Sequence, residues 1–176
     1  MKKTQIIILS ILMILAIVWA IWYSSFGNEK NVNNFDDCVA LGGPIMELYP
    51  PICTAPDGRS FKQDVGNEME KQDLIRIESP RPNVKISSPL QITGMARGNW
   101  FFEASFPIKL LDNSGNEIGS SIAQVEGDWM TTNFVRFNST LEFNSGTSTK
   151  GFLILKKDNP SGLPEKEDEL RIPVAF

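Results

Sequence analysis

The chain has 176 residues, a formal net charge of −4 and a pI of about 4.9. This acidic balance argues against a nucleic-acid-binding protein, because such proteins present basic surfaces to phosphates. The sequence contains no histidine, which excludes Ser-His-Asp and Cys-His catalysis and removes a common zinc ligand. We therefore expect no catalytic residues, no metal site, no cofactor and no nucleic-acid partner.

Residues 1–23 predict an uncleaved signal anchor. Lys2 and Lys3 precede an uncharged apolar run, 6–23, whose residues would span about 27 Å as a helix. Aromatic residues, which favour the headgroup region, gather at its far end: Trp19, Trp22 and Tyr23. A cleaved signal peptide is the alternative, although it has a shorter apolar core and small residues at its cleavage site. The two lysines predict a cytoplasmic N-terminus, so we expect a single-pass cell-membrane protein with an extracytoplasmic C-terminal domain.

The exported part divides by composition into four segments. Residues 24–34 are polar and rich in Asn, as in a juxtamembrane linker. Residues 35–61 contain both cysteines. Residues 62–73 are charged and poor in apolar residues, which favours a solvated linker over a short helix. Residues 74–176 form the main domain.

Cys38 and Cys53 are the only cysteines. Without histidine or CxxC spacing they make a poor metal or redox site, whereas disulfides persist outside the cytosol. We expect a structural disulfide that staples a loop rich in Gly and Pro, with a free or reactive pair as the alternative. Residues 49–61 also faintly resemble the start of a Kazal-type protease inhibitor, in which a cysteine is followed by an Asp-Gly turn and an aromatic residue.

From Leu74 onward the apolar residues alternate with a period of two, which is typical of strands with one buried face. Clusters of Gly, Asn, Asp and Pro, which favour turns, separate the alternating stretches: 74–79, 90–96, 99–112, 116–125, 134–143, 150–157 and 169–176. Seven short strands without a helical period favour an all-β fold, an antiparallel sandwich of immunoglobulin type. A small closed barrel is the alternative.

The alternation also predicts which side chains point inward. We expect Ile118 and Ile122 to share one face, and Arg136 to point outward. One buried cluster between two sheets is expected to contain Trp100, Phe102, Phe106, Val135, Phe137, Leu141, Leu155, Ile172 and Val174.

Several short motifs in 74–176 occur together in a known family. They are an early "SP…I.G.A" strand pair, a hairpin with Asp and Gly, and a late "PSG" turn before a terminal "RIPVAF" strand. The matching positions are Ser88, Pro89, Gly94, Leu111, Asp112, Gly115, Pro160, Ser161, Gly162, Ile172, Pro173, Val174 and Phe176. This region resembles the bacterial immunoglobulin-like domain associated with spore-germination machinery. The resemblance implies a non-catalytic domain on an exported, membrane-attached bacterial protein.

Two aromatic residues are candidates for partner binding. Trp129 and Phe134 flank a predicted loop, where exposed rings could bind a sugar or a peptide; core packing or loop anchoring is the alternative. The leading hypothesis is a membrane-anchored envelope protein whose domain binds or scaffolds an envelope protein or glycan, with a link to germination. The alternatives are a small carboxylate-dependent hydrolase and a protease-inhibitor-like module that uses the cysteine loop.

Overall fold

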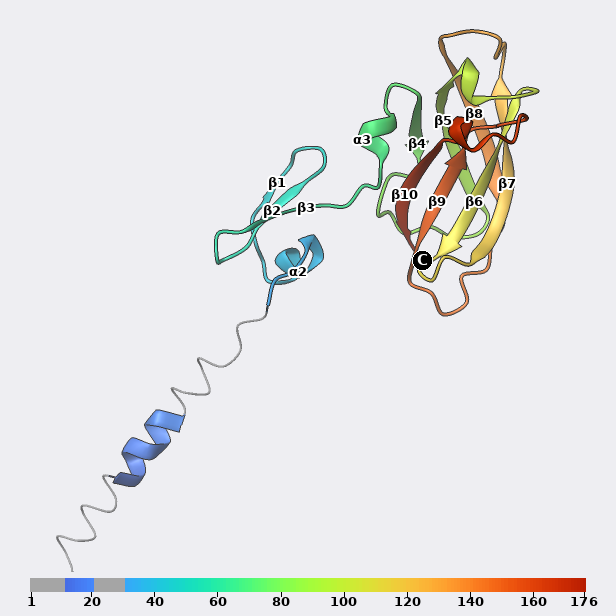
Figure 1. Ribbon diagram of the computed structural model, residues 1–176. Coiled ribbons are helices and arrows are strands. Elements are labelled where there is room, and N and C mark those ends of the chain that lie inside the picture. The colour runs from blue at the N-terminus through green and yellow to red at the C-terminus, as the bar shows by residue number, and fades with distance from the viewer. Residues whose placement is uncertain (1–11, 21–30) are drawn as a thin grey trace, which may run out of the picture. The chain divides into compact units, whose positions relative to one another are not determined.

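The computed structural model describes residues 12–20 and 31–176 (Figure 1). Residues 12–20, which belong to the predicted anchor, are helical. Within these ranges no helical segment combines the length and apolar character that a membrane crossing requires. The remainder of the predicted anchor 1–23, and most of the predicted linker 24–34, fall outside the described residues. The chain divides into two compact units, Met1–Gln63 and Asp64–Phe176.

Residues 31–63 of the first unit, called the cysteine unit here, form a short helix and a small sheet. The helix α2 (Phe35–Ala40) begins after Asn34, whose side chain accepts a hydrogen bond from a first-turn backbone amide at 2.8 Å. The antiparallel sheet has three very short strands, β1 (Ile45–Met46), β2 (Ile52–Thr54) and β3 (Ser60–Lys62). Its buried apolar cluster is equally small: Val32, Cys38, Cys53 and Ala55. A core of this size makes the unit depend on its disulfide.

The second unit, called the β unit here, contains the short helix α3 (Glu68–Lys71) and seven strands. The strands are β4 (Ile75–Ser79), β5 (Leu90–Arg97), β6 (Ser105–Asp112), β7 (Glu117–Glu126), β8 (Phe134–Leu141), β9 (Lys150–Lys156) and β10 (Glu169–Ala175). All neighbouring strands are antiparallel, in the order β10-β9-β6-β7-β8-β5-β4.

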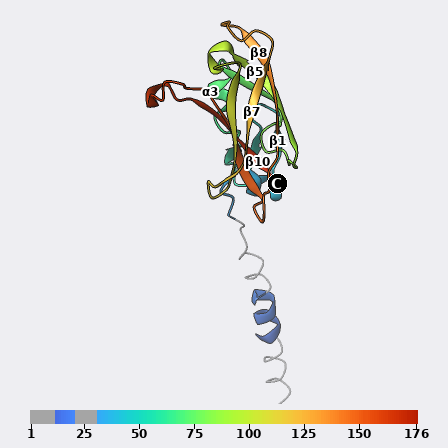
Figure 2. The ribbon, with the colours of Figure 1, turned by 90° about the vertical axis from the view of Figure 1, so that its right-hand side faces the viewer.

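Strand β7 joins two layers of this sheet. It pairs with β6 over most of its length but with β8 only from Gln124 to Glu126. The sheet therefore folds over at β7, with β10, β9 and β6 in one layer and β8, β5 and β4 in the other (Figures 1 and 2). Lys85, after β4, forms a parallel bridge with Ala175, which brings the sandwich close to a barrel. The prediction of an all-β antiparallel sandwich is confirmed.

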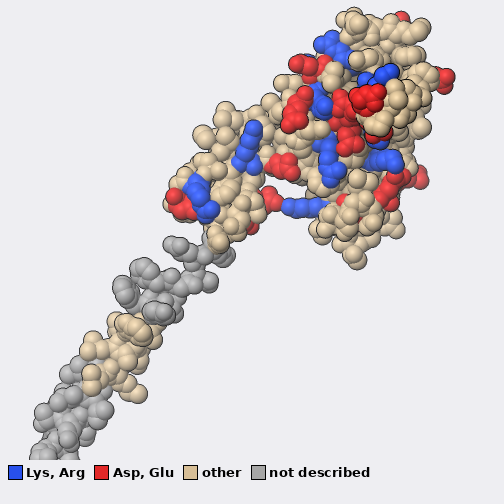
Figure 3. All heavy atoms as spheres, viewed as in Figure 1, with Lys and Arg blue, Asp and Glu red and all other residues tan. Residues whose placement is uncertain are grey.

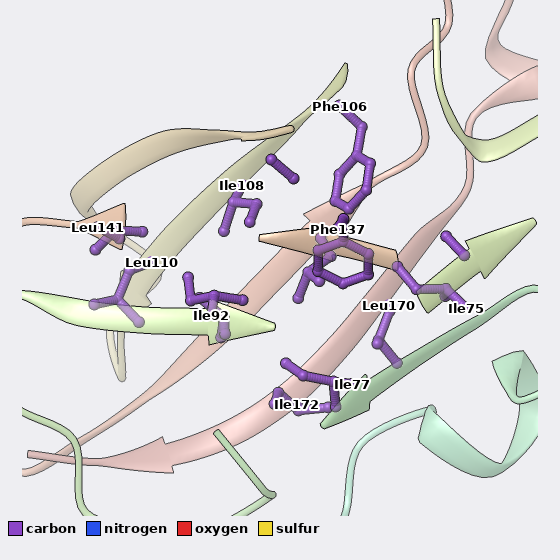
Figure 4. Close-up of a cluster of buried hydrophobic side chains, with 14 of the residues drawn as sticks. Ile75, Ile77, Ile92, Phe106, Ile108, Leu110, Phe137, Leu141, Leu170 and Ile172 are labelled. Atoms are coloured by element: carbon purple, nitrogen blue, oxygen red, sulfur yellow. The ribbon is translucent and has the colours of Figure 1, made fainter. Parts of the chain in front are cut away.

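The core lies between these layers (Figure 4). The rings of Phe106 on β6 and Phe137 on β8 meet edge to face across the core, with centroids 4.9 Å apart. Most of the predicted inward set is fully buried: Trp100, Phe106, Phe137, Leu141, Leu155, Ile172 and Val174. Val135 is partly buried against the same cluster. The alternation in 134–143 and 169–176 thus located these strands and their inward faces correctly.

The prediction for Phe102 is wrong, because the expected long strand 99–112 is interrupted. A 3₁₀ turn at Gly98–Trp100 and a tight turn before Ser105 precede β6. In this second turn Glu103 and Ala104 adopt positive φ values of 48° and 62°, a region that non-glycine residues rarely enter. The alternation restarts at Ser105, so Phe102 is 40% exposed and Phe101 is buried in its place.

The prediction that Ile118 and Ile122 share one face is also wrong. The register between β6 and β7 shifts at Leu110, so that Ile118 is the extra residue of a β-bulge. A bulge reverses the alternation beyond it. Ile118 packs against the core, whereas Ile122 is 55% exposed and Ala123 is buried.

The segment expected to be a charged linker, 62–73, belongs to the β unit from Asp64 onward. The side chain of Asn67 donates to the Glu169 carbonyl oxygen at 2.9 Å and accepts from the Arg171 amide at 2.7 Å. The Asn67 amide in turn donates to the Arg171 carbonyl oxygen at 3.1 Å. This one asparagine therefore pairs with the outer edge of β10 as a neighbouring strand would.

The rest of the β10 edge is closed by the segment after β4. The Asn83 amide donates to the Pro173 carbonyl oxygen, and the Ala175 amide and carbonyl bond with Val84 and Ile86. Pro173 itself has no amide hydrogen to leave exposed. The edge-facing backbone groups of β10 are therefore paired, which removes the template that an open strand edge offers to another chain.

Replacing Asn67 tests this closure. We expect Asn67→Ala to lower the free energy of unfolding by about 1–3 kcal/mol, because it leaves the Arg171 amide and the Glu169 carbonyl without partners. Hydrogen exchange should accelerate at the Arg171 amide. Asn113→Ala is a suitable control, since Asn113 is exposed and its side chain makes no hydrogen bond within the described part of the chain. Equal urea midpoints for the two variants would contradict the closure.

Two adjacent substitutions test burial and register in β8. Phe137→Ala should cost about 3–5 kcal/mol because it leaves a cavity between the layers. Arg136→Ala should cost less than about 1 kcal/mol, because Arg136 points outward and pairs with Glu78 at the surface. Urea unfolding of both variants gives the comparison, and similar losses would contradict the assigned register.

Candidate functional site

An arginine–aromatic cluster lies on the outward face of the layer formed by β4, β5 and β8. The strand register places Arg97 directly opposite Phe134, and Arg76 on β4 in the neighbouring row. The guanidinium carbons of Arg76 and Arg97 each lie 4.4 Å from the centroid of the Phe134 ring, within the range of a cation–π interaction. We call Arg76, Phe134 and Arg97 the arginine clamp.

Backbone carbonyl groups hold both guanidiniums in place. Arg97 donates from Nε to the Asp73 carbonyl oxygen at 2.9 Å and from Nη1 to the Thr132 carbonyl oxygen at 3.0 Å. Arg76 donates from Nε to the Gln72 carbonyl oxygen at 2.6 Å. These bonds fix the orientation of the side chains but leave their charges uncompensated.

The clamp differs in this respect from its neighbour on the same face. Arg136 pairs with Glu78, with Nη1 and Oε2 3.0 Å apart. Across residues 31–176, neither Arg76 nor Arg97 has a carboxylate within ion-pair distance. Elsewhere on the β unit, Figure 3 shows positive and negative side chains interspersed over the visible face. The clamp thus concentrates two unneutralised cations at one place.

The loop before β8 is held against the clamp. The Gly98 amide donates to the Asn133 carbonyl oxygen at 3.3 Å. A Cβ atom at Gly98 would lie only 1.9 Å from the Thr131 carbonyl oxygen and 2.2 Å from that of Trp129, so this approach requires glycine. Together with the bond from Arg97 to Thr132, these contacts give the loop a defined position.

The two predicted partner-binding residues occupy different positions. Trp129 is partly buried and packs against the core. The Phe134 ring contacts the guanidiniums of Arg76 and Arg97. This surface therefore presents two cations to a partner, and not a bare aromatic ring. Met130, between them in the chain, is 78% exposed. A role for either aromatic residue in partner binding stays a prediction.

Sequence reasoning missed the arginines of the clamp. The alternation in β4 and β8 does place Arg76 and Phe134 on outward faces. Arg76, Arg97 and Phe134 come together, however, only because β4, β5 and β8 pair in one particular register. That register is a property of the folded sheet and has no clear signal in the sequence.

The predicted disulfide is confirmed. Cys38 on α2 and Cys53 on β2 are bonded with an S–S distance of 1.99 Å and a Cα–Cα distance of 6.1 Å, and both are fully buried. A Cβ atom at Gly43 would lie 2.7 Å from each sulfur, so the loop closes tightly over the bond. Between the cysteines the loop displays an exposed apolar strip: Ile45, Met46 and Leu48.

Acidic residues gather in a shallow depression of about 280 Å³ beside α3 and β10. Two of its carboxylates form ion pairs, Asp168 with Lys71 at 2.6 Å and Glu167 with Lys156 at 3.6 Å. In the described ranges no group of His, Cys, Asp or Glu is arranged to hold a metal ion. Charged residues that line the depression therefore form ion pairs with one another, Asp168 with Lys71 and Glu167 with Lys156.

Asp112 illustrates the structural use of a carboxylate in this domain. The side-chain amide of Asn116 donates to Asp112 at 3.0 Å, and the backbone amides of Asn116 and Ser114 each donate at 2.8 Å. These bonds hold the pKa of Asp112 below its usual value, and the bond from the Asn116 side chain contributes most. They fix the turn between β6 and β7, where the sequence predicted a hairpin.

Residues 74–162 match the model of the family described as the immunoglobulin-like domain of bacterial spore germination. The chain belongs to this family. The match runs from the start of β4 through β9 and leaves the cysteine unit outside. A search of curated proteins found no match, and neither did a search of solved structures. The matched residues, called the germination-type domain here, make up most of the β unit and include the strands β4, β5 and β8 that carry the clamp.

The cysteine bond and the germination-type domain should contribute separately to stability. We expect Cys53→Ser to loosen the cysteine unit while the melting temperature of the β unit changes little, because each unit has its own core. Calorimetry would detect a lost or lowered first transition, and Cys38 should become open to alkylation without reductant. A comparable drop in the main transition would contradict this separation.

Proposed function

We propose that this chain is an exported protein of the bacterial cell envelope, held in the membrane by residues 1–23. Lys2 and Lys3, followed by the apolar run 6–23, support this topology with the N-terminus inside. The Cys38–Cys53 disulfide adds support, because structural disulfides are rare in the bacterial cytosol and persist outside it. Residues 31–63 and the β unit would then lie on the extracytoplasmic side.

In this proposal the germination-type domain binds or scaffolds another envelope component and catalyses no reaction. The family match over 74–162 carries the proposal, because immunoglobulin-like domains generally serve recognition. The ordered outward face with the arginine clamp supplies a surface for that role. The family description also favours a setting in the germination machinery.

The two alternatives have less support. A carboxylate-dependent hydrolase requires a pair of carboxyl groups that are free to act on a substrate, whereas two carboxylates of the shallow depression beside β10 are paired with lysines. An inhibitor-like module would use the loop between Cys38 and Cys53, which the family match does not include. The binding domain is therefore the function that we favour.

Fractionation of intact cells tests the proposed location. The protein should stay in the membrane pellet after alkaline carbonate, and external protease should remove the β unit from cells whose wall has been opened. A cytoplasmic protein of the same cells serves as the protection control. Recovery of a soluble form that starts near residue 24 would replace the anchor with a cleaved peptide, and full protection from protease would contradict export.

A further inference from the structure

The arginine clamp presents fixed hydrogen-bond donors without an acceptor. Both Nη atoms of Arg76, and Nη2 of Arg97, have no hydrogen-bond partner within residues 31–176. Guanidiniums held in one orientation form a planar fork that matches an oxyanion bidentately. We propose that the arginine clamp binds carboxylates in an acidic segment of a protein partner. This inference rests on the proposed function, because it names the ligand class of the binding domain.

The charge of the molecule favours separate carboxylates over a dense polyanion. The chain carries a net charge of −4, so a long phosphate polymer would be repelled by most of the surface while gaining only two close cations. Glu78 and Glu126 on the same face would add to that repulsion. An acidic peptide segment can instead place one or two carboxylates at the clamp and keep its other residues neutral.

The neighbouring loop favours a protein over a glycan. Met130, two residues before Thr132, is 78% exposed although contacts with Arg97 and Gly98 hold the loop in place. An ordered loop that bonds to Arg97 and also presents a long apolar side chain suits a ligand with both apolar and acidic groups. A segment in which leucine-like and acidic residues alternate has this chemistry.

Arginine side-chain NMR of the full chain in detergent micelles can observe the clamp directly. The probe is a blocked hexapeptide with alternating leucine and glutamate residues, and its control carries glutamine in place of glutamate. We expect the Nε–Hε signals of Arg76 and Arg97 to shift on titration with the glutamate peptide, while that of Arg136 stays in place. The glutamine peptide should cause no such shift.

Substitutions then separate the clamp from charge in general. Arg76→Gln should weaken binding of the glutamate peptide about tenfold or more, since it removes the fork. Arg136→Gln, on the same face, should change it less than about twofold. Arg76→Lys retains the charge without the fork and should still weaken binding. Arg76 is the deciding position because Arg97 also holds the loop, and far-ultraviolet circular dichroism would confirm that each variant is folded.

The proposal is overturned if the glutamate peptide causes no selective shift, or if the glutamine peptide binds equally well. Equal losses of binding for Arg76→Gln and Arg136→Gln would also contradict it. So would tighter binding of poly(glycerol phosphate) or inorganic phosphate than of the peptide. The proposed function fails separately: a cytoplasmic location contradicts it whatever the clamp binds, whereas an exported protein with an inert clamp contradicts only this inference.

Discussion

The edge-to-face contact between Phe106 and Phe137 holds the two layers of the β unit together. One ring comes from β6 and the other from β8, and their centroids are 4.9 Å apart in the middle of the core. Because β6 and β8 pair with opposite sides of β7, this contact fixes how the sheet folds over. Buried aromatic rings contribute large apolar areas, and an edge-to-face pair adds about 0.5–1.5 kcal/mol beyond that burial.

The folded sheet determines which surfaces remain for recognition. Asn67 and the segment after β4 pair with the outer edge of β10, so strand addition there would have to displace existing hydrogen bonds. The depression beside α3 and β10 is shallow and open to solvent. The outward faces of the layers are therefore the natural binding surfaces, and the face of β4, β5 and β8 carries an arginine pair that backbone carbonyls already orient.

The periodicity of apolar residues predicted much of this fold. It succeeded in β8 and β10, which keep their alternation to the end of the strand, and in β4 as far as Ile77, where the register with β5 shifts. It failed where backbone geometry departs from the regular pattern. The positive φ values at Glu103 and Ala104 interrupt the alternation, and the bulge at Ile118 reverses it; both depend on the surrounding structure.

The candidate site was less predictable, for a related reason. Phe134 could be singled out as an aromatic residue beside a loop, but Arg76 and Arg97 join it only through the pairing of three strands. The role of Asn67 could not be predicted from the sequence either, since its partner Arg171 lies 104 residues further along the chain. The disulfide was predictable because two cysteines that follow a predicted signal anchor, without histidine or CxxC spacing, have few other roles.

Site-specific photo-crosslinking in intact cells tests most directly whether the face of β4, β5 and β8 recognises a protein. A photoreactive amino acid would replace Met130, in the loop that bonds to Arg97, or, as the matched control, Ile122 on β7; both side chains are exposed. The account predicts a discrete protein adduct from position 130, reduced by Arg76→Gln, and none from position 122. Adducts from position 122 alone, or equal adducts from both positions, would contradict it.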